Sequence, residues 1–228
     1  MTGRLRLALV ASTGGSVANV LLARPSFARH VVGVASDRDC AALDVARRHG
    51  VPAAALRERT GRAFSDRLLG WLRAHDVEWV ISFYTKLFAG PLLDAYRDRI
   101  LNLHPSLLPS FKGLHPFEDA LHAGVRFVGT TIHLIDERMD EGKIVLQTVT
   151  PCDPGCDPAD VRHVLFVQQC RSLLQVVRWI AEERLVVDGP HVRIRGARFD
   201  DPACAPALDD PEARALDVPP RPRAGAAA

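Results

Sequence analysis

Two polar side chains of different chemistry stand close together in the segment Asn102-Leu103-His104-Pro105. Asn102 carries an amide that can donate a hydrogen bond, and His104 carries an imidazole that titrates near neutral pH. Side chains alternate along an extended segment, so these two are expected to point to one side. The pair therefore indicates acid–base chemistry, although a polar strand end with a capping histidine has the same residues.

A third polar group, Asp140, lies in the short segment Met139-Asp140-Glu141-Gly142. An aspartate before Glu-Gly is typical of a turn, because its side chain can hydrogen-bond to the backbone that follows. Asp140 takes part in the chemistry only if the fold brings it to His104.

Alternating strands and helices are predicted to position these groups. Apolar runs predict strands over 5–11, 30–35, 79–83 and 100–103, and helices are expected over about 16–22, 39–49 and 64–74. Strands that alternate with helices form parallel βαβ units, so we expect an α/β fold with a Rossmann-like, doubly wound, mostly parallel sheet. Ligands bind at the carboxyl ends of strands in such sheets, where Asn102 and His104 lie.

The second half of the sequence has a different pattern. We expect strands over 128–135 and 144–149, a helix over 158–183 that begins at Asp157, and a terminal hairpin over 185–194. Residues 201–228 are rich in Pro and Ala and lack periodicity, so they are expected to form a disordered tail.

Composition excludes several classes of protein. The net charge of +2 and the scattered arginines argue against a nucleic-acid partner, and the apolar run at 5–11 is too short to span a membrane. The five cysteines, at 40, 152, 156, 170 and 204, are odd in number and irregularly spaced. That pattern favours free thiols in a cytoplasmic protein, with a chance Cys152–Cys156 pair as the alternative and no metal site.

A longer set of motifs resembles the folate-dependent formyltransferases, especially the phosphoribosylglycinamide formyltransferases of purine biosynthesis. The set is Asn102 to Pro109, Gly113-Leu114-His115, Gly129-Thr130-Thr131-Ile132-His133 and Met139 to Gly142. The resemblance covers about residues 5–195. It implies one formyltransferase domain over 1–200, with an acceptor-binding half over about 1–100 and a folate-binding catalytic half over about 101–200.

The resemblance also implies a reaction and its residues. A small-molecule amine attacks the formyl group of 10-formyltetrahydrofolate, with Asn102, His104 and Asp140 as catalytic residues. An amide donor stabilises the oxyanion that forms, His104 relays protons, and a carboxylate nearby favours the protonated imidazole. His133 is expected to contact the catalytic residues rather than the substrate. Folate contacts are implied at Tyr84, Thr85, Lys86, Leu87, Asp136 and Asp140, and acceptor contacts at Gly15, Ser16, Val17, Phe83, Pro105, Phe166 and Gln169.

Several of the implied acceptor contacts depart from the family's pattern. Val17 stands where the family has an Asn of the phosphate loop, and Phe166 stands where it has a polar or basic residue. Gln169 stands where the family has a Glu that binds ribose. Phe83 replaces a Gly, and Lys86 an Arg that meets the folate tail. A site that loses polar contacts binds its former ligand less well. We therefore expect a specialised acceptor, such as an amino sugar or a biosynthetic amino acid derivative, with phosphoribosylglycinamide as the alternative.

Two other classes compete with a transferase. A nucleotide-dependent oxidoreductase would need G-x-G-x-x-G after the first strand, where this sequence has Ser12-Thr13-Gly14-Gly15-Ser16. A catalytically inactive folate-binding module would not need Asn102, His104 and Asp140 intact. The sequence leaves the oligomeric state open between a monomer and a homodimer.

Overall fold

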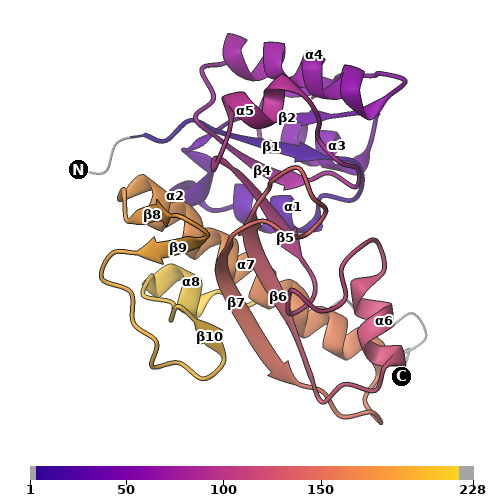
Figure 1. The fold of residues 1–228 in the computed structure, drawn as a ribbon, viewed down its shortest axis with the longest axis vertical. Coiled ribbons are helices and arrows are strands. Elements are labelled where there is room, and N and C mark those ends of the chain that lie inside the picture. Colours follow the sequence, from indigo (N-terminus) through magenta and orange to yellow (C-terminus); the bar gives the residue numbers. More distant parts are fainter. Residues whose placement is uncertain (1–3, 221–228) are drawn as a thin grey trace.

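A single eight-stranded sheet runs through the computed structural model, which describes residues 4–220 (Figure 1). The strand order is β10-β7-β6-β5-β4-β1-β2-β3. The first five strands in sequence pair in parallel: β1 (Leu7–Ala11), β2 (Val31–Ser36), β3 (Ala53–Ala55), β4 (Trp79–Phe83) and β5 (Ile100–His104). The predicted α/β class with a mostly parallel, Rossmann-like sheet is confirmed.

Helices cover both faces of the sheet because the strands are apolar on both sides. Every residue of β1 is buried, and its side chains divide between two cores. Leu7 and Leu9 face one core, while Ala8 and Val10 face the other. The first core holds α1 (Ser16–Leu22), α3 (Ala41–Arg48) and α7 (Pro158–Ala181), and the second holds α4 (Gly61–Ala74) and α5 (Pro91–Ala95).

The sheet changes from parallel to antiparallel at β5. The next strand, β6 (Phe127–Leu134), pairs antiparallel with β5, and β7 (Ile144–Pro151) pairs antiparallel with β6. In this register Asn102 lies opposite His133, and His104 lies opposite Thr131. The carboxyl end of β5 therefore lies between a parallel half and an antiparallel half.

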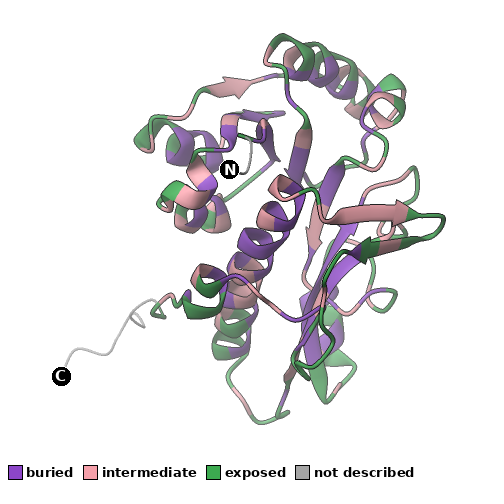
Figure 2. Ribbon diagram, turned by 90° about the vertical axis from the view of Figure 1, so that its left-hand side faces the viewer, coloured by how far each residue is buried: buried purple, intermediate pink, exposed green. Residues whose placement is uncertain are grey.

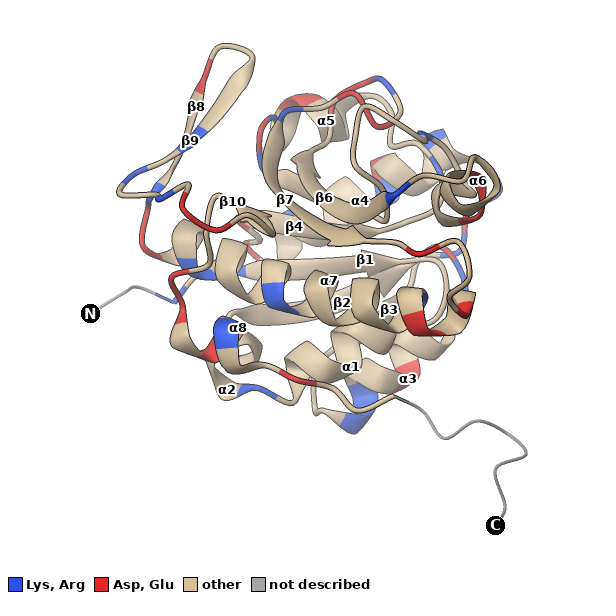
Figure 3. Cartoon of the chain, turned by 90° about the horizontal axis from the view of Figure 1, so that it is seen from below, with Lys and Arg blue, Asp and Glu red and all other residues tan. Residues whose placement is uncertain are grey.

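The helix α7 spans most of the molecule and is largely buried (Figure 2). It begins where the sequence predicts, since Asp157 accepts a hydrogen bond from the Ala159 N–H and Pro158 fills the first turn. The predicted terminal hairpin is also present, as β8 (Leu185–Asp188) and β9 (His191–Ile194), and it projects from the body in Figure 3.

Three short helices and one short strand escaped prediction. They are α2 (Pro25–Ala28), α5, α6 (Pro116–His122) and β3. Each of the three helices begins with a proline and contains seven residues or fewer, so periodicity has little length over which to show.

The expected disordered tail over 201–228 is wrong for its described part. Residues 204–205 form β10 (Cys204–Ala205), which pairs with β7, and α8 (Pro211–Ala215) packs against α7. Ala213 and Leu216 enter the first core, and Asp209 forms an ion pair with Arg184 at 2.7 Å. The rest of the predicted tail, 221–228, lies outside the described residues. Within 4–220, no helix is long and apolar enough to cross a membrane.

Candidate active site

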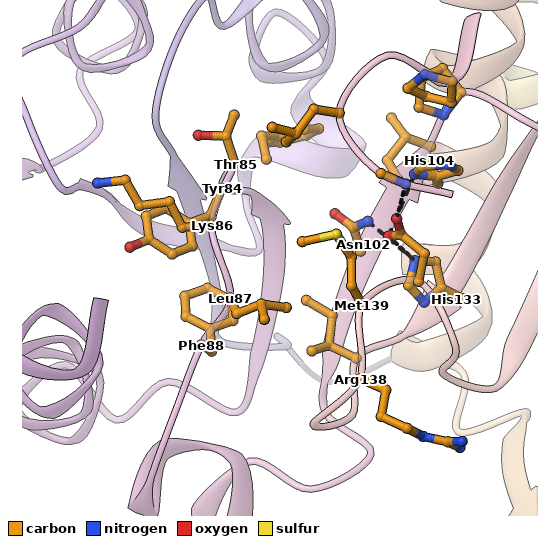
Figure 4. A pocket seen from close by; sticks show the side chains of 18 of the residues that line it. Tyr84, Thr85, Lys86, Leu87, Phe88, Asn102, His104, His133, Arg138 and Met139 are labelled. Atoms are coloured by element: carbon orange, nitrogen blue, oxygen red, sulfur yellow. Dashed lines mark hydrogen bonds and ion pairs between the residues drawn. The ribbon is translucent and has the colours of Figure 1, made fainter. Parts of the chain in front are cut away.

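A cleft of about 310 Å³ opens at the carboxyl ends of β4 and β5, where the parallel and antiparallel halves meet. Figure 4 shows Asn102, His104 and His133 on one side, and Tyr84, Thr85, Lys86, Leu87 and Phe88 on the opposite side. Pockets that hold small molecules are mostly apolar with a few convergent polar groups, and this cleft fits that description.

His104 is held in one orientation by its own loop. Its Nε2 lies 2.9 Å from the Phe111 carbonyl oxygen, which can only accept a hydrogen bond, so Nε2 carries the proton. The other ring nitrogen, Nδ1, lies 3.5 Å from Oδ1 of Asp140. When the imidazole is neutral, Nδ1 is the atom that can take up a proton, and the carboxylate then stabilises the resulting cation.

Asp140 is fixed by backbone geometry as well as by a hydrogen bond. Its Oδ2 accepts from the Gly113 N–H at 2.9 Å, and its φ of 54° lies in the left-handed region that Asp and Asn tolerate best. The following turn passes close to β6, where a Cβ at Gly142 would collide with the Leu134 carbonyl. This close approach brings Asp140, far along the chain from β5, to His104.

Asn102 is oriented by the histidine opposite it on β6. His133 Nδ1 lies 3.1 Å from the Leu134 carbonyl oxygen and donates to it, which leaves Nε2 as an acceptor for Asn102 Nδ2 at 3.1 Å. Burial lowers the pKa of His133, so this ring is neutral near pH 7. One amide hydrogen of Asn102 is thus committed to His133, and the second remains for a ligand in the cleft.

Lys86 has a partner that the sequence did not reveal. Its Nζ lies 3.0 Å from Oδ2 of Asp37, a buried carboxylate at the end of β2 that also binds Arg38. Burial opposes ionisation of Asp37, but hydrogen bonds from Arg38 and Lys86 outweigh it and lower the pKa of Asp37 to about 2. Lys86 therefore reaches the cleft with its charge already paired.

The structure brings together most, but not all, of the residues predicted for the site. The cleft is lined by Val17, Phe83, Tyr84, Thr85, Lys86, Leu87, Asn102, His104, Pro105, His133, Asp140 and Gln169. Gly15, Ser16, Asp136 and Phe166 are not among its lining residues. Phe166 instead packs against the first core, and Asp136 accepts a hydrogen bond from the Arg138 N–H at 2.8 Å.

Sequence reasoning missed an apolar part of the cleft. Phe88, Leu103, Leu114, Ile135 and Met139 line it, and Leu114 and Met139 are 68% and 41% exposed. The available signal was sequence position, since Phe88, Leu103 and Met139 adjoin Leu87, His104 and Asp140, and Leu114 lies in the motif Gly113-Leu114-His115.

Comparison with known proteins gives a consistent assignment. Residues 5–177 match the model of the formyl transferase family. The chain is 34% identical over 190 residues to a phosphoribosylglycinamide formyltransferase of Mycobacterium tuberculosis (strain ATCC 25618 / H37Rv), covering 81% of this chain and 88% of that protein. It is also 34% identical over 110 residues to a formyltetrahydrofolate deformylase of Corynebacterium sp. (strain P-1), covering 48% of this chain and 38% of that protein.

Solved structures agree with the sequence comparison. The crystal structure of glycinamide ribonucleotide transformylase 1 from Symbiobacterium toebii superposes with a TM-score of 0.77 at 37% identity, covering 83% of this chain and 93% of that one.

Proposed function

This chain belongs to the formyl transferase family, and from that premise we propose that phosphoribosylglycinamide is its acceptor. The chain is an enzyme that takes the formyl group of 10-formyltetrahydrofolate. The acceptor proposal is carried by the relatives named phosphoribosylglycinamide formyltransferase, of which one is 34% identical over 81% of this chain. These relatives favour phosphoribosylglycinamide over the specialised amine expected from the sequence.

The arrangement of His104 and Asp140 supports a role in proton transfer. The amine that attacks a formyl carbon must lose a proton, and the departing folate nitrogen must gain one. His104 Nδ1 is the bare nitrogen on the cleft side, and Asp140 at 3.5 Å stabilises the imidazolium between the two transfers.

The amide of Asn102 supports the stabilisation of developing negative charge. Because His133 takes only one of its two hydrogens, the other can donate to the oxygen of the formyl group as that oxygen becomes anionic. A donor fixed in place before the reaction stabilises the transition state more than one that must reorient, and loss of one such donor costs about 10²–10³ in rate.

The apolar part of the cleft fits the flat ring system of the folate donor. Leu87, Phe88, Ile135 and Met139 offer hydrocarbon surface beside Asn102, and burial of apolar area contributes about 25 cal/mol per Å². Residues Tyr84 to Leu87 and Asp140 are the contacts that we propose for the donor.

One observation favours a second candidate, an amine without a phosphoribosyl group. Val17 and Gln169, both neutral, line the cleft together with Asn102 and His104. Val17 cannot form a side-chain hydrogen bond, and Gln169 brings no charge of its own to a bond with a ribose hydroxyl, whereas hydrogen bonds to charged groups are worth about 1.5–3 kcal/mol. An amino sugar or an amino acid derivative would lose fewer hydrogen bonds at Val17 and Gln169 than a phosphorylated ribonucleotide.

The deciding measurement is kcat/KM for each candidate amine in the presence of 10-formyltetrahydrofolate. The release of tetrahydrofolate is the signal that is measured. A value above about 10⁵ M⁻¹s⁻¹ for phosphoribosylglycinamide, within the usual range for an enzyme on its own substrate, supports the first candidate. A much lower value, together with faster turnover of an amino sugar or amino acid amine, supports the second. Release of tetrahydrofolate at the same rate without any amine would contradict both and indicate hydrolysis.

Variants at Val17 and Gln169 distinguish further between the two candidate acceptors. Gln169→Glu restores a carboxylate and Val17→Asn restores an amide without altering Asn102 or His104. If phosphoribosylglycinamide is the acceptor that these positions have adapted to, neither variant improves its kcat/KM. A tenfold gain in both would show that these positions are built for another amine.

A further inference from the structure

Two cysteines lie together in the turn that connects β7 to α7, away from the catalytic groups. Cys152 follows the last residue of β7, and Cys156 precedes Asp157, which is the N-cap residue of α7. The backbone folds them toward each other, because the Cys156 N–H donates to the Asp153 carbonyl at 3.0 Å and closes a tight turn.

The turn is fixed at both ends. The Cys152 N–H donates to the Arg126 carbonyl at 2.8 Å, and the Gly155 N–H donates to the Asp153 carboxylate at 2.9 Å. Pro154 adds a restricted φ inside the turn. The spacing of the two cysteines is therefore set by the fold and does not depend on a mobile loop.

Both side chains enter one small apolar cluster between α6 and the start of α7. Cys152 is 6% exposed and packs with Phe117 and Val161, while Cys156 is half-buried at the edge of the same cluster. Burial raises the pKa of Cys152, and a hydrogen bond with the Cys156 thiol raises that pKa further. The two thiols thus lie at the same cluster, four residues apart in the chain.

We propose that Cys152 and Cys156 are an oxidation site, where a reversible disulfide forms within the turn. A disulfide requires Cα atoms about 4.4–6.8 Å apart and converging Cβ atoms. Two cysteines that flank the folded segment Asp153-Pro154-Gly155 and enter one cluster are placed for such a bond. The other three cysteines, 40, 170 and 204, lie in other parts of the fold.

A metal ion is the competing ligand for a pair of thiols. Structural zinc takes four ligands. Among residues 4–220, no group of three or more His, Cys, Asp or Glu side chains is placed to hold a metal. The pair is therefore suited to thiol–disulfide exchange.

The exchange uses a small disulfide such as oxidised glutathione. The more accessible Cys156 thiolate attacks one sulfur, breaks the S–S bond and releases one glutathione thiolate, which leaves a mixed disulfide on Cys156. The Cys152 thiolate then attacks the Cys156 sulfur and releases the second glutathione. The two cysteine protons pass to the released thiolates, so two protein thiols are oxidised and one small disulfide is reduced to two thiols.

The location gives this site a connection to the catalytic residues. Phe111 packs against the same cluster, and its carbonyl accepts the hydrogen bond of His104. A disulfide would therefore form at the cluster that also holds Phe111, the residue whose carbonyl orients His104.

Redox titration of the full chain tests the proposal. The protein is equilibrated at fixed ratios of reduced to oxidised glutathione, quenched in acid, unfolded, and alkylated, and the labels are counted by mass spectrometry. We expect five labels under reducing conditions and three after oxidation, with the 152–156 peptides linked and all five labels restored by dithiothreitol.

Single variants separate the pair from general thiol oxidation. Cys40→Ser, which removes a half-buried cysteine elsewhere, should still lose two labels, whereas Cys156→Ser should keep all four of its thiols free. Cys152→Ser should stop at a glutathione adduct on Cys156. Five labels throughout the titration, or a disulfide that joins other cysteines, would overturn the proposal.

Discussion

His104 and Asp140 face each other on one side of the cleft with Nδ1 and Oδ1 3.5 Å apart, although the whole of β6 lies between them in the chain. When the imidazole is neutral, the facing nitrogen is the unprotonated one, because the Phe111 carbonyl accepts a hydrogen bond from Nε2. The relationship supports the proposal that Nδ1 of His104 moves a proton and that Asp140 stabilises the resulting imidazolium.

Removing the imidazole tests the first role. His104→Ala should lower kcat by two orders of magnitude or more, since general acid–base groups contribute about 10²–10⁴-fold. Binding of a folate analogue and the unfolding midpoint are measured beside turnover. The matched control is His122→Ala, an exposed histidine at the end of α6, which should leave turnover unchanged. Near wild-type turnover in His104→Ala would remove His104 from the mechanism.

Removing the charge of Asp140 tests the second role. Asp140→Asn keeps an oxygen for the Gly113 N–H and tolerates the left-handed backbone, but it no longer stabilises an imidazolium. We expect a lower kcat, because the imidazolium formed at His104 loses the negative charge 3.5 Å from its Nδ1. The control is Asp136→Asn, in the same loop but outside the cleft lining. If Asp140→Asn and wild type have the same rate, Asp140 acts only as a turn former.

Two buried histidines predict how stability depends on pH. Burial lowers the pKa of both His133 and His30, whereas in the unfolded chain a histidine takes up a proton near pH 6.5. The unfolded state thus binds more protons below that pH, and the free energy of unfolding should fall as the pH falls from about 6.5. Urea unfolding at pH 7.5, 6.5 and 5.5 measures the slope.

Substitutions assign that slope to its residues. His133→Gln and His30→Gln each remove one titrating group and should each flatten the dependence, while exposed His122→Gln should not. Asp37 affects stability in a separate pH range. Its pKa is lowered to about 2, so its contribution to the free energy of unfolding is lost only as the pH falls below about 4. A slope between pH 7.5 and 5.5 that neither buried-histidine variant changes would contradict the assignment.

The segment after residue 200, which the sequence suggested to be a tail, packs into the core, so a substitution there should lower the free energy of unfolding strongly. Leu216 is 2% exposed and enters the first core, so Leu216→Ala should lower the free energy of unfolding by about 2–5 kcal/mol. Phe199→Ala, at a 75% exposed position nearby, should change it by less than about 0.5 kcal/mol. Equal effects would mean that the segment after residue 200 does not contribute to the core.

The sequence predicted the elements whose patterns are long or uniform. The buried strand β1 is a continuous apolar run, β4 and β5 are mostly apolar, and α7 has both a clear cap and many turns. The C-terminal segment could not be predicted in this way, because distant partners hold it. Gln175, fully buried on α7, accepts hydrogen bonds from the Asp209 and Asp210 N–H groups.

The candidate site shows the same division. Asn102 and His104 were predictable from alternation along one strand, and the paired register places His133 beside Asn102. The pairing of Lys86 with Asp37 depends on the lateral order of β2 and β4 around β1, which no local pattern records. The roles of these residues, the cytoplasmic location and the choice between monomer and homodimer stay predictions.

The placement of the reacting groups on β5, β6 and the loop after β6 has a consequence for how such enzymes diversify. Asn102, His104, His133 and Asp140 come from one continuous segment, 102–140, whereas Val17 and Gln169 reach the cleft from α1, which precedes that segment, and α7, which follows it. Point changes on those two helices can alter the accepted amine while the reacting groups keep their geometry. A mutant library restricted to positions 17 and 169 is therefore a route to new acceptors on an unchanged formyl-transfer centre.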